Sequence, residues 1–531
     1  MLEKDSLFKT GEKERIWQKY CGFLDLSIVE FMEIQEQLLM DQIELVHDSP
    51  LARKLMPRKP KDIHEFRKLV PLTTFDDYAA YLDEVNEDVL AVKPYLWAQT
   101  SGRGGVLKLV PYTERGIDNL AMLTIAMMIL ACASRRGEVR IGNGMRLLHC
   151  LPPPPYLTGI LSRIVPQLLD ARIIPPLDEY QDTELESRIR DGFQIALRTG
   201  VDLLCSLTNV LVKMGEVFAE SSGQMKFSRP MLHPKVMLRL IRAWLRAKRE
   251  KRVLLPKDLW PLQGLACYGT DTSIYREQLI HYWGKEPLEL YGATEAGLIA
   301  VNAWNKKSMT FAPSTCFLEF APEKEWLKSR ETKDYQPATV LLDEVRPGER
   351  YEVILTNFYG MPFLRYRVGD LIRIVALQDE ETRIEIPQMV FDSRADDIID
   401  IGGFPRLDEK TTWQAIANTG IKYEDWSIRK EYERNQPIIS LYIELKEEKE
   451  SEEVERLLHQ QLVTINRDYR DLVNMLNIRL LRVTLLPAGS FQRYYEQKQR
   501  AGASLAHLKP PHMNASDAII QDLVEPRATS T

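Results

Sequence analysis

A short segment at positions 290–297, which reads LYGATEAG, combines three side chains that suit a nucleotide. Tyr291 offers an aromatic ring to a nucleobase, and Thr294 offers a hydroxyl to a phosphate oxygen. Glu295 offers a carboxylate to Mg²⁺, a hard cation that prefers oxygen ligands. Residues 268–271, which include Gly269 and Thr270, form a similar small-residue turn 22 positions earlier. Taken alone, each turn is equally consistent with a polar loop after a strand.

A glycine-rich segment at positions 100–108 reads TSGRGGVLK. Its glycines allow the backbone to close around an anion, with hydroxyl and N–H groups as donors to phosphate. The candidate contacts are therefore Thr100, Ser101, Gly102 and Arg103. The spacing is not that of a Walker A loop, and a plain glycine turn remains the alternative.

Three further segments carry charge at positions where a chain turns. Asp370, in LRYRVGDLIR, is predicted to lie on a glycine turn between two strands, where a carboxylate accepts both ribose hydroxyls. Residues 394–403 (RADDIIDIGG) begin with Arg394 and read as an interdomain hinge. Lys509, in GASLAHLKPP, precedes two prolines that hold it stiffly. The alternatives are a hairpin turn with surface charges, a charged linker and an exposed lysine.

The elements that must position these residues predict an α/β fold. Helical patterns dominate residues 1–90, and strand-like and helix-like segments alternate from about 96 onward. Residues 120–133 are predicted to form a buried helix. After about 394 the pattern is that of a small α+β module. We therefore predict a large domain over 1–393 and a smaller one over 394–531.

Composition excludes several classes of protein. The net charge of −6 gives no basic excess for nucleic acid. No apolar run approaches the ~20 residues of a membrane span, and the charged N-terminus does not resemble a signal peptide. The 6 scattered cysteines are typical of reduced, mostly buried thiols. These features predict a cytoplasmic protein without a membrane or nucleic-acid partner.

One stretch runs against this charge balance. Residues 239–252, RLIRAWLRAKREKR, are strongly basic. The simpler interpretation is a solvated amphipathic helix with Leu240, Trp244 and Leu245 facing inward. The functional alternative is a surface for an anionic ligand or a partner.

Taken together and in their order along the chain, the five motif segments resemble the adenylate-forming superfamily over roughly residues 95–513. Within it the chain is most similar to the plant auxin-responsive acyl acid–amido synthetases and their bacterial relatives. The stretches TNFYGMPFLRYRVGD, LDEKTTWQAI and GASLAHLKPP carry this likeness. The resemblance implies a large adenylate-forming domain followed by a small mobile one.

The resemblance also implies roles for individual residues. Residues 100–102 and Arg103 would contact ATP phosphates, Gly269 and Thr270 would lie beside adenine with Tyr291 and Gly292, and Asp370 would hold ribose. Thr294 would serve the phosphates and Glu295 would serve Mg²⁺. Arg394 would contribute at the hinge, and Lys410 and Lys509 of the small domain would reach the phosphates or the acyl carboxylate.

The function so implied is ATP-dependent activation of a carboxylic acid as an acyl-adenylate, followed by transfer to the amine of an amino acid. One departure concerns the glycine-rich segment, where two threonines of the family are Arg103 and Gly104 here. The guanidinium of Arg103 is able to replace the lost hydroxyls through charge-assisted bonds to phosphate. An acyl-CoA ligase and an inactive nucleotide- or acyl-binding homologue remain the alternatives, and the sequence does not identify the acid or the oligomeric state.

Overall fold

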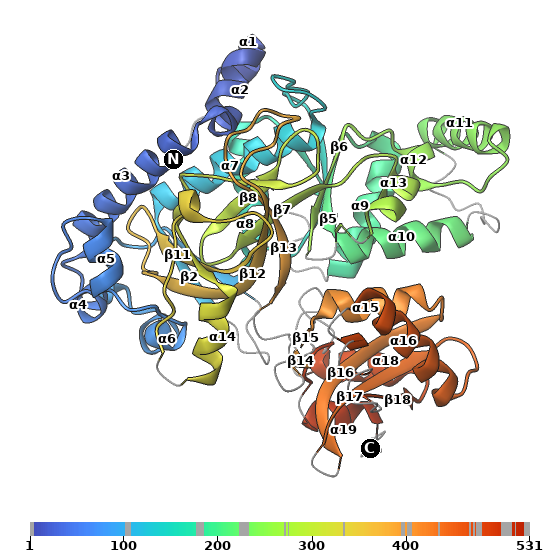
Figure 1. Ribbon diagram of the computed structural model, residues 1–531. Coiled ribbons are helices and arrows are strands. Elements are labelled where there is room, and N and C mark those ends of the chain that lie inside the picture. The colour runs from blue at the N-terminus through green and yellow to red at the C-terminus, as the bar shows by residue number, and fades with distance from the viewer. Residues whose placement is uncertain are drawn as a thin grey trace. The chain divides into compact units, whose positions relative to one another are not determined.

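The computed structural model describes residues 5–100, 108–176, 185–221, 233–269, 272–273, 275–332, 335–394, 399–400, 406–433, 436–466, 469–470, 473, 480–500, 512–515 and 517–524. The chain divides into two compact units (Figure 1). The first contains residues 1–368 and 372–391, and the second contains residues 369–371 and 392–531.

The first unit begins with helices and a β-hairpin. The helices are α1 (Leu7–Thr10), α2 (Lys13–Cys21), α3 (Ile28–Val46), α4 (Pro50–Leu55), α5 (Ile63–Leu69) and α6 (Asp76–Leu82). Ser27 and Glu30 form a capping box that starts α3, because each satisfies a backbone N–H of the first turn. The hairpin consists of β1 (Leu96–Thr100) and β2 (Lys108–Tyr112), which pair in antiparallel register.

An 11-stranded mixed sheet forms the centre of the fold, in the order β10-β11-β12-β13-β9-β8-β7-β6-β5-β3-β4. The parallel part contains β3 (Arg146–Cys150), β4 (Arg172–Ile174), β5 (Leu203–Leu207), β6 (Gly264–Tyr268) and β7 (Leu288–Ala293). The remaining strands are β8 (Gly297–Asn302), β9 (Met309–Phe311), β10 (Cys316–Pro322), β11 (Arg350–Asn357), β12 (Tyr366–Ala376) and β13 (Gln388–Arg394). The predicted α/β class is confirmed.

Helices cover both faces of the parallel part. They are α7 (Glu114–Cys132), α8 (Leu157–Leu168), α9 (Leu185–Thr199), α10 (Thr208–Ser221), α11 (Pro234–Arg249), α12 (Pro256–Leu259) and α13 (Arg276–Trp283), with α14 (Glu323–Glu331) following β10. Successive residues of each strand enter two different cores, as a doubly covered sheet requires. One core contains Leu147, Leu203 and Ala266, and the other contains Leu148, Leu204 and Leu265.

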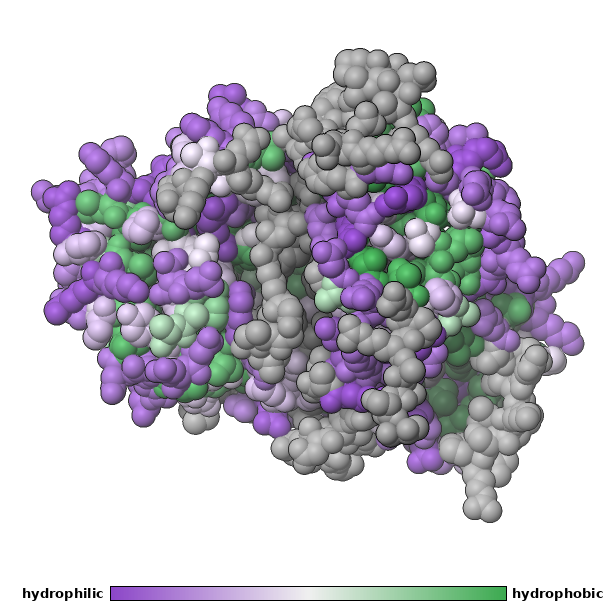
Figure 2. Space-filling view, turned by 90° about the horizontal axis from the view of Figure 1, so that it is seen from below, coloured by the Kyte–Doolittle hydropathy of each residue, from purple (hydrophilic) through white to green (hydrophobic). Residues whose placement is uncertain are grey.

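The predicted buried helix at 120–133 is confirmed as part of α7. Within the described part of the chain, α7 alone is long and apolar enough to cross a bilayer, and 78% of its most apolar stretch is buried inside the unit. On the face seen in Figure 2, hydrophilic residues dominate and hydrophobic residues form smaller groups between them.

The second unit contains a three-stranded sheet of β16 (Tyr423–Glu433), β17 (Gln436–Leu445) and β18 (Leu481–Leu486). Its helices are α15 (Glu409–Asn418), α16 (Ser451–Ile465), α18 (Ser490–Arg500) and α19 (Asp517–Val524), and a short ladder joins β14 (Ile399–Asp400) to β15 (Arg406–Leu407). Trp426, Leu441 and Leu458 belong to its core.

Two predictions about local structure are wrong. Asp370 does not lie on a turn, because β12 runs without interruption through that position. Of the three residues expected on the inner face of α11, Trp244 and Leu245 do not face inward, because they are 54% and 53% exposed, whereas the partly buried Leu240 packs against the core as predicted. The wrong prediction for Asp370 came from Gly369, which the strand accommodates at φ 77°.

A buried ion pair joins three distant parts of the first unit. Arg365 donates through Nε and Nη2 to the two oxygens of Glu319 at 2.9 and 2.8 Å, and through Nη1 to the carbonyl of Val70 at 2.7 Å. The Glu319 side chain is 1% exposed. The pair therefore connects β10 and the start of β12 to the end of α5, with Arg67 as a second, longer partner of Glu319 at 3.2 Å.

We expect Arg365→Met to lower the free energy of unfolding by about 3–5 kcal/mol, because it leaves Glu319 charged and buried. Urea denaturation measures this loss. The double variant Arg365→Met/Glu319→Met removes both charges and should recover much of it. Lys307→Met, which breaks an exposed pair with Glu381, is the control and should barely change stability. Equal losses in the single and double variants would contradict this account.

Candidate active site

The predicted nucleotide turn is a tight connection between β7 and β8 that two distant strands hold in place. Tyr112, the last residue of β2, donates its hydroxyl to the carbonyl of Thr294 at 2.6 Å. Asn357, the last residue of β11, donates from Nδ2 to the carbonyl of Glu295 at 2.8 Å. Because both turn carbonyls are fixed by buried side chains, the half-buried Thr294 and Glu295 side chains project from a rigid turn.

The Glu295 carboxylate is itself oriented. Tyr366, the first residue of β12, donates its hydroxyl to Glu295 Oε1 at 3.2 Å.

Burial raises the pKa of the nearby Tyr112 well above its usual value, and the charge of Glu295 raises it further. Tyr112 therefore stays a neutral hydrogen-bond donor at any physiological pH.

Gly292 is required by the shape of this hairpin. A Cβ at this position would lie 2.4 Å from the carbonyl oxygen of Gly297 across the ladder. The pairing of β7 with β8 also shifts register between Tyr291 and Gly292. Any side chain at 292 would force the two strands apart, whereas glycine leaves its backbone exposed beside the turn.

Gly269 follows the neighbouring strand β6 and adopts φ 141°, a conformation that favours glycine. Its carbonyl accepts a hydrogen bond from Thr272 Oγ1 at 3.3 Å, and Thr272 lies 2.6 Å from Thr208 Oγ1. Ala266 of β6 pairs with Leu288 of β7, so the same offset of 22 residues places Gly269 level with Tyr291. The fold thus brings the two small-residue turns side by side at the carboxyl ends of adjacent strands.

The Tyr291 side chain is 5% exposed and packs against Phe391 of β13, with ring centroids 6.1 Å apart. The Tyr291 ring is therefore already packed against another aromatic ring. The exposed surface beside it is the backbone of Gly292.

The other predicted site residues fall into two groups. Asp370 is buried within β12, Lys410 is exposed at the second position of α15, and Arg394 ends β13. Thr100 pairs through its backbone with Lys108, which closes the base of the glycine-rich segment. Ser101, Gly102, Arg103, Thr270 and Lys509 lie outside the described residues, as do residues 395–398 of the predicted hinge.

Comparison with known proteins gives matches along most of the chain. The N-terminal, central and C-terminal domains of the GH3 family match residues 23–155, 309–394 and 410–518, together more than half of the 531 residues. The chain belongs to the GH3 family. This confirms the family resemblance drawn from the motifs.

Two relatives of this GH3 protein align over most of their lengths. It is 24% identical to the indole-3-acetic acid-amido synthetase GH3.5 of Arabidopsis thaliana over 73% of this chain and 71% of the relative. It is 26% identical to the GH3 domain-containing protein of Mus musculus over 94% of this chain and 87% of the relative.

Solved structures confirm the fold. The AtGH3.15 acyl acid amido synthetase, in complex with 2,4-DB, superposes with a TM-score of 0.66 at 18% identity and covers 93% of both chains. A 2-hydroxyisobutyryl-CoA ligase superposes with a TM-score of 0.58 at 13% identity, covering 93% of this chain and 92% of that one. The GH3 protein therefore shares the fold of these two structures.

Sequence reasoning missed the residues that support the turn. Tyr112 and Asn357 are 182 and 62 residues from the carbonyls they bind, so no local spacing connects them to Thr294 and Glu295. Tyr366 lies within the RYRVGD stretch that drew attention to Asp370. The hydroxyl of Tyr366 donates a hydrogen bond to Glu295, whereas the role of Asp370 towards ribose stays a prediction.

Sequence reasoning also missed a buried cation beside β3. Arg188 of α9 is 1% exposed, and its Nη2 lies 3.3 Å from Nδ1 of His149. Burial, with the charge of Arg188, lowers the pKa of His149 to about 3, so the imidazole is neutral. Nε of Arg188 has no hydrogen-bond partner, and no carboxylate pairs with its guanidinium among the described residues. A buried charge in this state is costly unless a ligand completes its bonds.

The second unit holds a charged cluster centred on His512. Its Nδ1 lies 2.5 Å from Glu409 and its Nε2 lies 2.7 Å from Asp425, while its ring stacks on Trp426 at 4.2 Å. Tyr495 donates to the other oxygen of Asp425 at 2.7 Å. Burial alone would lower the pKa of His512, but the hydrogen bonds and charges of Asp425 and Glu409 raise it to about 10.

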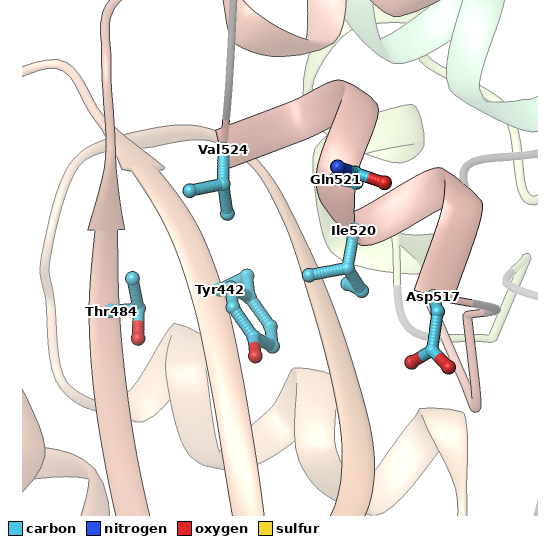
Figure 3. Close-up of a pocket in the computed structure, with 6 residues that line it drawn as sticks. All are labelled: Tyr442, Thr484, Asp517, Ile520, Gln521 and Val524. Carbon is cyan, nitrogen blue, oxygen red and sulfur yellow. The ribbon is translucent and has the colours of Figure 1, made fainter.

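A surface hollow in the same unit, of about 390 Å³, contains none of the predicted site residues. Figure 3 shows Ile520 and Val524 of α19 facing Tyr442 and Thr484 of the sheet. The Tyr442 hydroxyl donates to Glu431, and Asp517 accepts from Arg429, both at 2.7 Å. The hydroxyl of Tyr442 and the carboxylate of Asp517 are therefore already bonded within the unit.

The raised pKa of His512 predicts a stability that depends on pH. Because the folded pKa of about 10 exceeds the unfolded pKa of ~6.5, its contribution is fully present below pH ~6.5 and is lost as pH rises through about 10. Thermal unfolding of the full chain between these limits should show a falling midpoint. His512→Gln should lower the midpoint at neutral pH and flatten the slope, whereas His281→Gln, at an exposed position, should retain the wild-type profile. An unchanged slope in His512→Gln would contradict the assignment.

Proposed function

We propose that this protein uses ATP to activate a carboxylic acid as an acyl-adenylate and then transfers the acyl group to the amine of an amino acid. The proposal rests on the turn of Thr294 and Glu295, whose carbonyls are held by Tyr112 and Asn357. This turn lies beside Gly269 and Gly292 in a chain of the GH3 family. Named amido synthetases among the relatives, including the indole-3-acetic acid-amido synthetase of Arabidopsis thaliana, support the same conclusion.

In the first half-reaction an oxygen of the substrate carboxylate attacks the α-phosphorus of ATP. The bond from that phosphorus to the bridging oxygen breaks, pyrophosphate leaves, and a mixed acyl–AMP anhydride remains. The hydroxyl of Thr294 supplies a hydrogen bond to a phosphate oxygen. Because Tyr112 and Asn357 fix the turn, this donor is positioned before the substrate arrives, which is how preorganised groups lower a barrier.

In the second half-reaction the amine nitrogen of an amino acid attacks the acyl carbon. The carbon–oxygen bond to AMP breaks, AMP carries away the electron pair, and the amine loses a proton. Lys410, exposed on α15, and Lys509 are proposed to supply positive charge to the phosphates or the carboxylate in one half-reaction each.

Glu295 is the proposed ligand for Mg²⁺. The described residues contain no group of three His, Cys, Asp or Glu side chains able to hold a metal. A single carboxylate nevertheless fits Mg²⁺, which usually takes one or two protein carboxylates together with substrate phosphates. The ion would neutralise charge on the phosphates, while Tyr366 keeps the Glu295 carboxylate facing one way.

The nucleoside is proposed to bind along the two glycine turns. Adenine would rest on the exposed backbone of Gly292 and beside Gly269, since the Tyr291 ring already packs against Phe391. Thr270 would line the same side, Asp370 would hold the ribose hydroxyls, and Arg394 would act at the hinge. Thr100, Ser101, Gly102 and Arg103 are the proposed phosphate loop.

The acid is proposed to bind beside Arg188 and His149. The backbone of Thr158, at the start of α8, bonds to His149, and Ser206 of β5 pairs with Cys150. Thr158 and Ser206 lie in two apolar segments, residues 155–161 and 203–211. The first leads from the carboxyl end of β3 into α8, and the second runs along β5 into α10. Gln99, next to the phosphate loop, donates its backbone N–H to the carbonyl of Pro155 at 2.9 Å, so this region adjoins the loop.

We expect Glu295→Gln to lower the rate of acid-dependent ATP–pyrophosphate exchange by about 10²-fold, because it removes the charge that serves the metal and phosphates. A panel of carboxylic acids supplies the substrate. Glu325→Gln alters a carboxylate of α14 that accepts a hydrogen bond from Tyr335, and it should leave exchange unchanged.

The same assay separates the proposal from its alternatives. An inactive homologue with Arg103 and Gly104 in its loop would bind ATP and support no exchange with any acid. An acyl-CoA ligase would support exchange and then yield a thioester with coenzyme A rather than an amide with an amino acid. Mass spectrometry of the product therefore decides the acceptor. An amide supports the assignment, whereas a thioester, or the absence of exchange with every acid, would overturn it.

We expect Arg188→Met to raise the KM for the acid by about tenfold or more while the KM for ATP stays unchanged, because it removes a charge-assisted bond to the acid. Exchange kinetics measure both values, and thermal unfolding checks that the variant folds. Arg188→Lys should rescue part of the loss, and Arg190→Met, at an exposed position of the same helix, should behave as wild type. An acid KM that does not move in Arg188→Met would refute this role.

A further inference from the structure

The orientation of α11 is the reverse of what an amphipathic helix normally shows. Three of the residues that face the unit are small, since Val236, Ala243 and Ala247 are 1%, 1% and 3% exposed, and the partly buried Leu240 packs beside them. Five other large apolar residues face solvent. Their exposed fractions are 42% for Met237, 50% for Leu238, 50% for Ile241, 54% for Trp244 and 53% for Leu245.

Arg239 explains why this face turns inward. Its Nη1 donates to the carbonyls of Ala196 and Leu197 at 2.8 and 2.6 Å, in the last turn of α9. Carbonyls at a helix C-terminus have no partner within their own helix, so an arginine there satisfies them. With Arg239 fixed on α9, the positions that follow it at helical spacing, Ala243 and Ala247, must face the unit as well.

The exposed apolar residues form a continuous stripe, which we call the α11 stripe and define as Met237, Leu238, Ile241, Trp244 and Leu245. Their spacing of three and four residues places them on one side of the helix. Figure 1 shows α11 at the outer end of the group formed by α9, α10, α12 and α13, which agrees with the exposed fractions of the stripe residues. Residues of this size are rarely exposed together on a protein without a partner surface.

Positive charge flanks the α11 stripe. Between positions 234 and 252 the chain has 8 Lys and Arg and a single acidic residue, although its net charge is −6. Six of these cations are exposed, namely Lys235, Arg242, Arg246, Lys248, Arg249 and Lys251. Lys248 extends along the stripe, with Nζ 4.8 Å from the centre of the Trp244 ring.

We propose that α11 docks on the surface of an anionic lipid bilayer, with the α11 stripe in the headgroup–acyl boundary and the flanking cations against lipid phosphates. A helix with Trp, Leu and Ile on one side and Lys and Arg beside them has the composition of an interfacial membrane helix. The negative charge of such a surface attracts the basic cluster and orients an otherwise acidic protein. The contact is peripheral and adds no membrane-spanning segment.

Two other occupants fit the charges and the apolar residues less well. A second copy of this chain would bring its own six exposed cations against these, and like charges repel. A nucleic acid would pair with the cations but would leave the five apolar side chains of the stripe without an apolar contact. The lipid surface satisfies both features at once, and this inference does not depend on the proposed activity.

Flotation of the full chain with lipid vesicles tests the proposal. The vesicles contain phosphatidylcholine, with or without phosphatidylglycerol. We expect the protein to float with the anionic vesicles and not with the neutral ones, and high salt should weaken the association. Absence of flotation with anionic vesicles would overturn the proposal.

Two variants separate the apolar and the electrostatic contributions. Ile241→Ser/Leu245→Ser should weaken partition into anionic vesicles by about tenfold or more. Arg242→Gln/Arg246→Gln/Arg249→Gln should remove the difference between anionic and neutral vesicles. The matched control is Val29→Ser/Leu45→Ser on α3, where the two residues are 63% and 43% exposed, and it should float as wild type does.

Each remaining outcome counts against the proposal. Equal flotation of the Ile241→Ser/Leu245→Ser variant would show that the stripe does not enter the bilayer. A dimer in sedimentation that this variant dissociates would assign the face to a second copy. Binding to duplex DNA that survives the same substitutions would assign it to nucleic acid. Thermal unfolding of every variant guards against a loss caused by misfolding.

Discussion

The turn between β7 and β8 presents a hydroxyl and a carboxylate because two buried side chains hold its carbonyls. Tyr112 binds the carbonyl of Thr294 and Asn357 binds that of Glu295, at 2.6 and 2.8 Å. The two donors end strands β2 and β11, so the turn is braced from both sides. A group fixed in this way needs little reorganisation when charge develops near it, and that is where electrostatic catalysis gains most.

Those two strands are in turn positioned by interactions far from the turn. β2 follows the glycine-rich segment, whose ends Thr100 and Lys108 pair with each other. Tyr112 and the proposed phosphate loop therefore belong to one hairpin. The buried pair of Arg365 and Glu319 joins β10 to the residue before Tyr366, whose hydroxyl contacts the Glu295 carboxylate. A buried ion pair contributes little net stability by itself, but removing one partner is costly, so such pairs specify one arrangement of strands.

Charge is used differently elsewhere in the molecule. In the second unit, His512 is enclosed by Glu409 and Asp425 and packed against Trp426, which keeps it protonated at neutral pH and ties the chain after residue 511 to α15 and β16. Arg239 fixes one face of α11 by capping α9, and the residues of the α11 stripe are left facing solvent as a result. In both places a single cation decides how a whole segment is oriented.

The sequence by itself determined the α/β class, the two small-residue turns and the membership that the motifs implied. It did so because backbone periodicity and turn residues are local, and because Gly269 and Gly292 are needed for local reasons of φ and strand separation. Only the tertiary structure decided that Tyr112, Asn357 and Tyr366 support Glu295 and Thr294, that Asp370 lies within a strand, and that Arg188 is buried beside His149. It also placed Trp244 and Leu245 of α11 in solvent while Leu240 packs inward, since helical periodicity shows which residues share a side but the cap of Arg239 on α9 selects the side that packs.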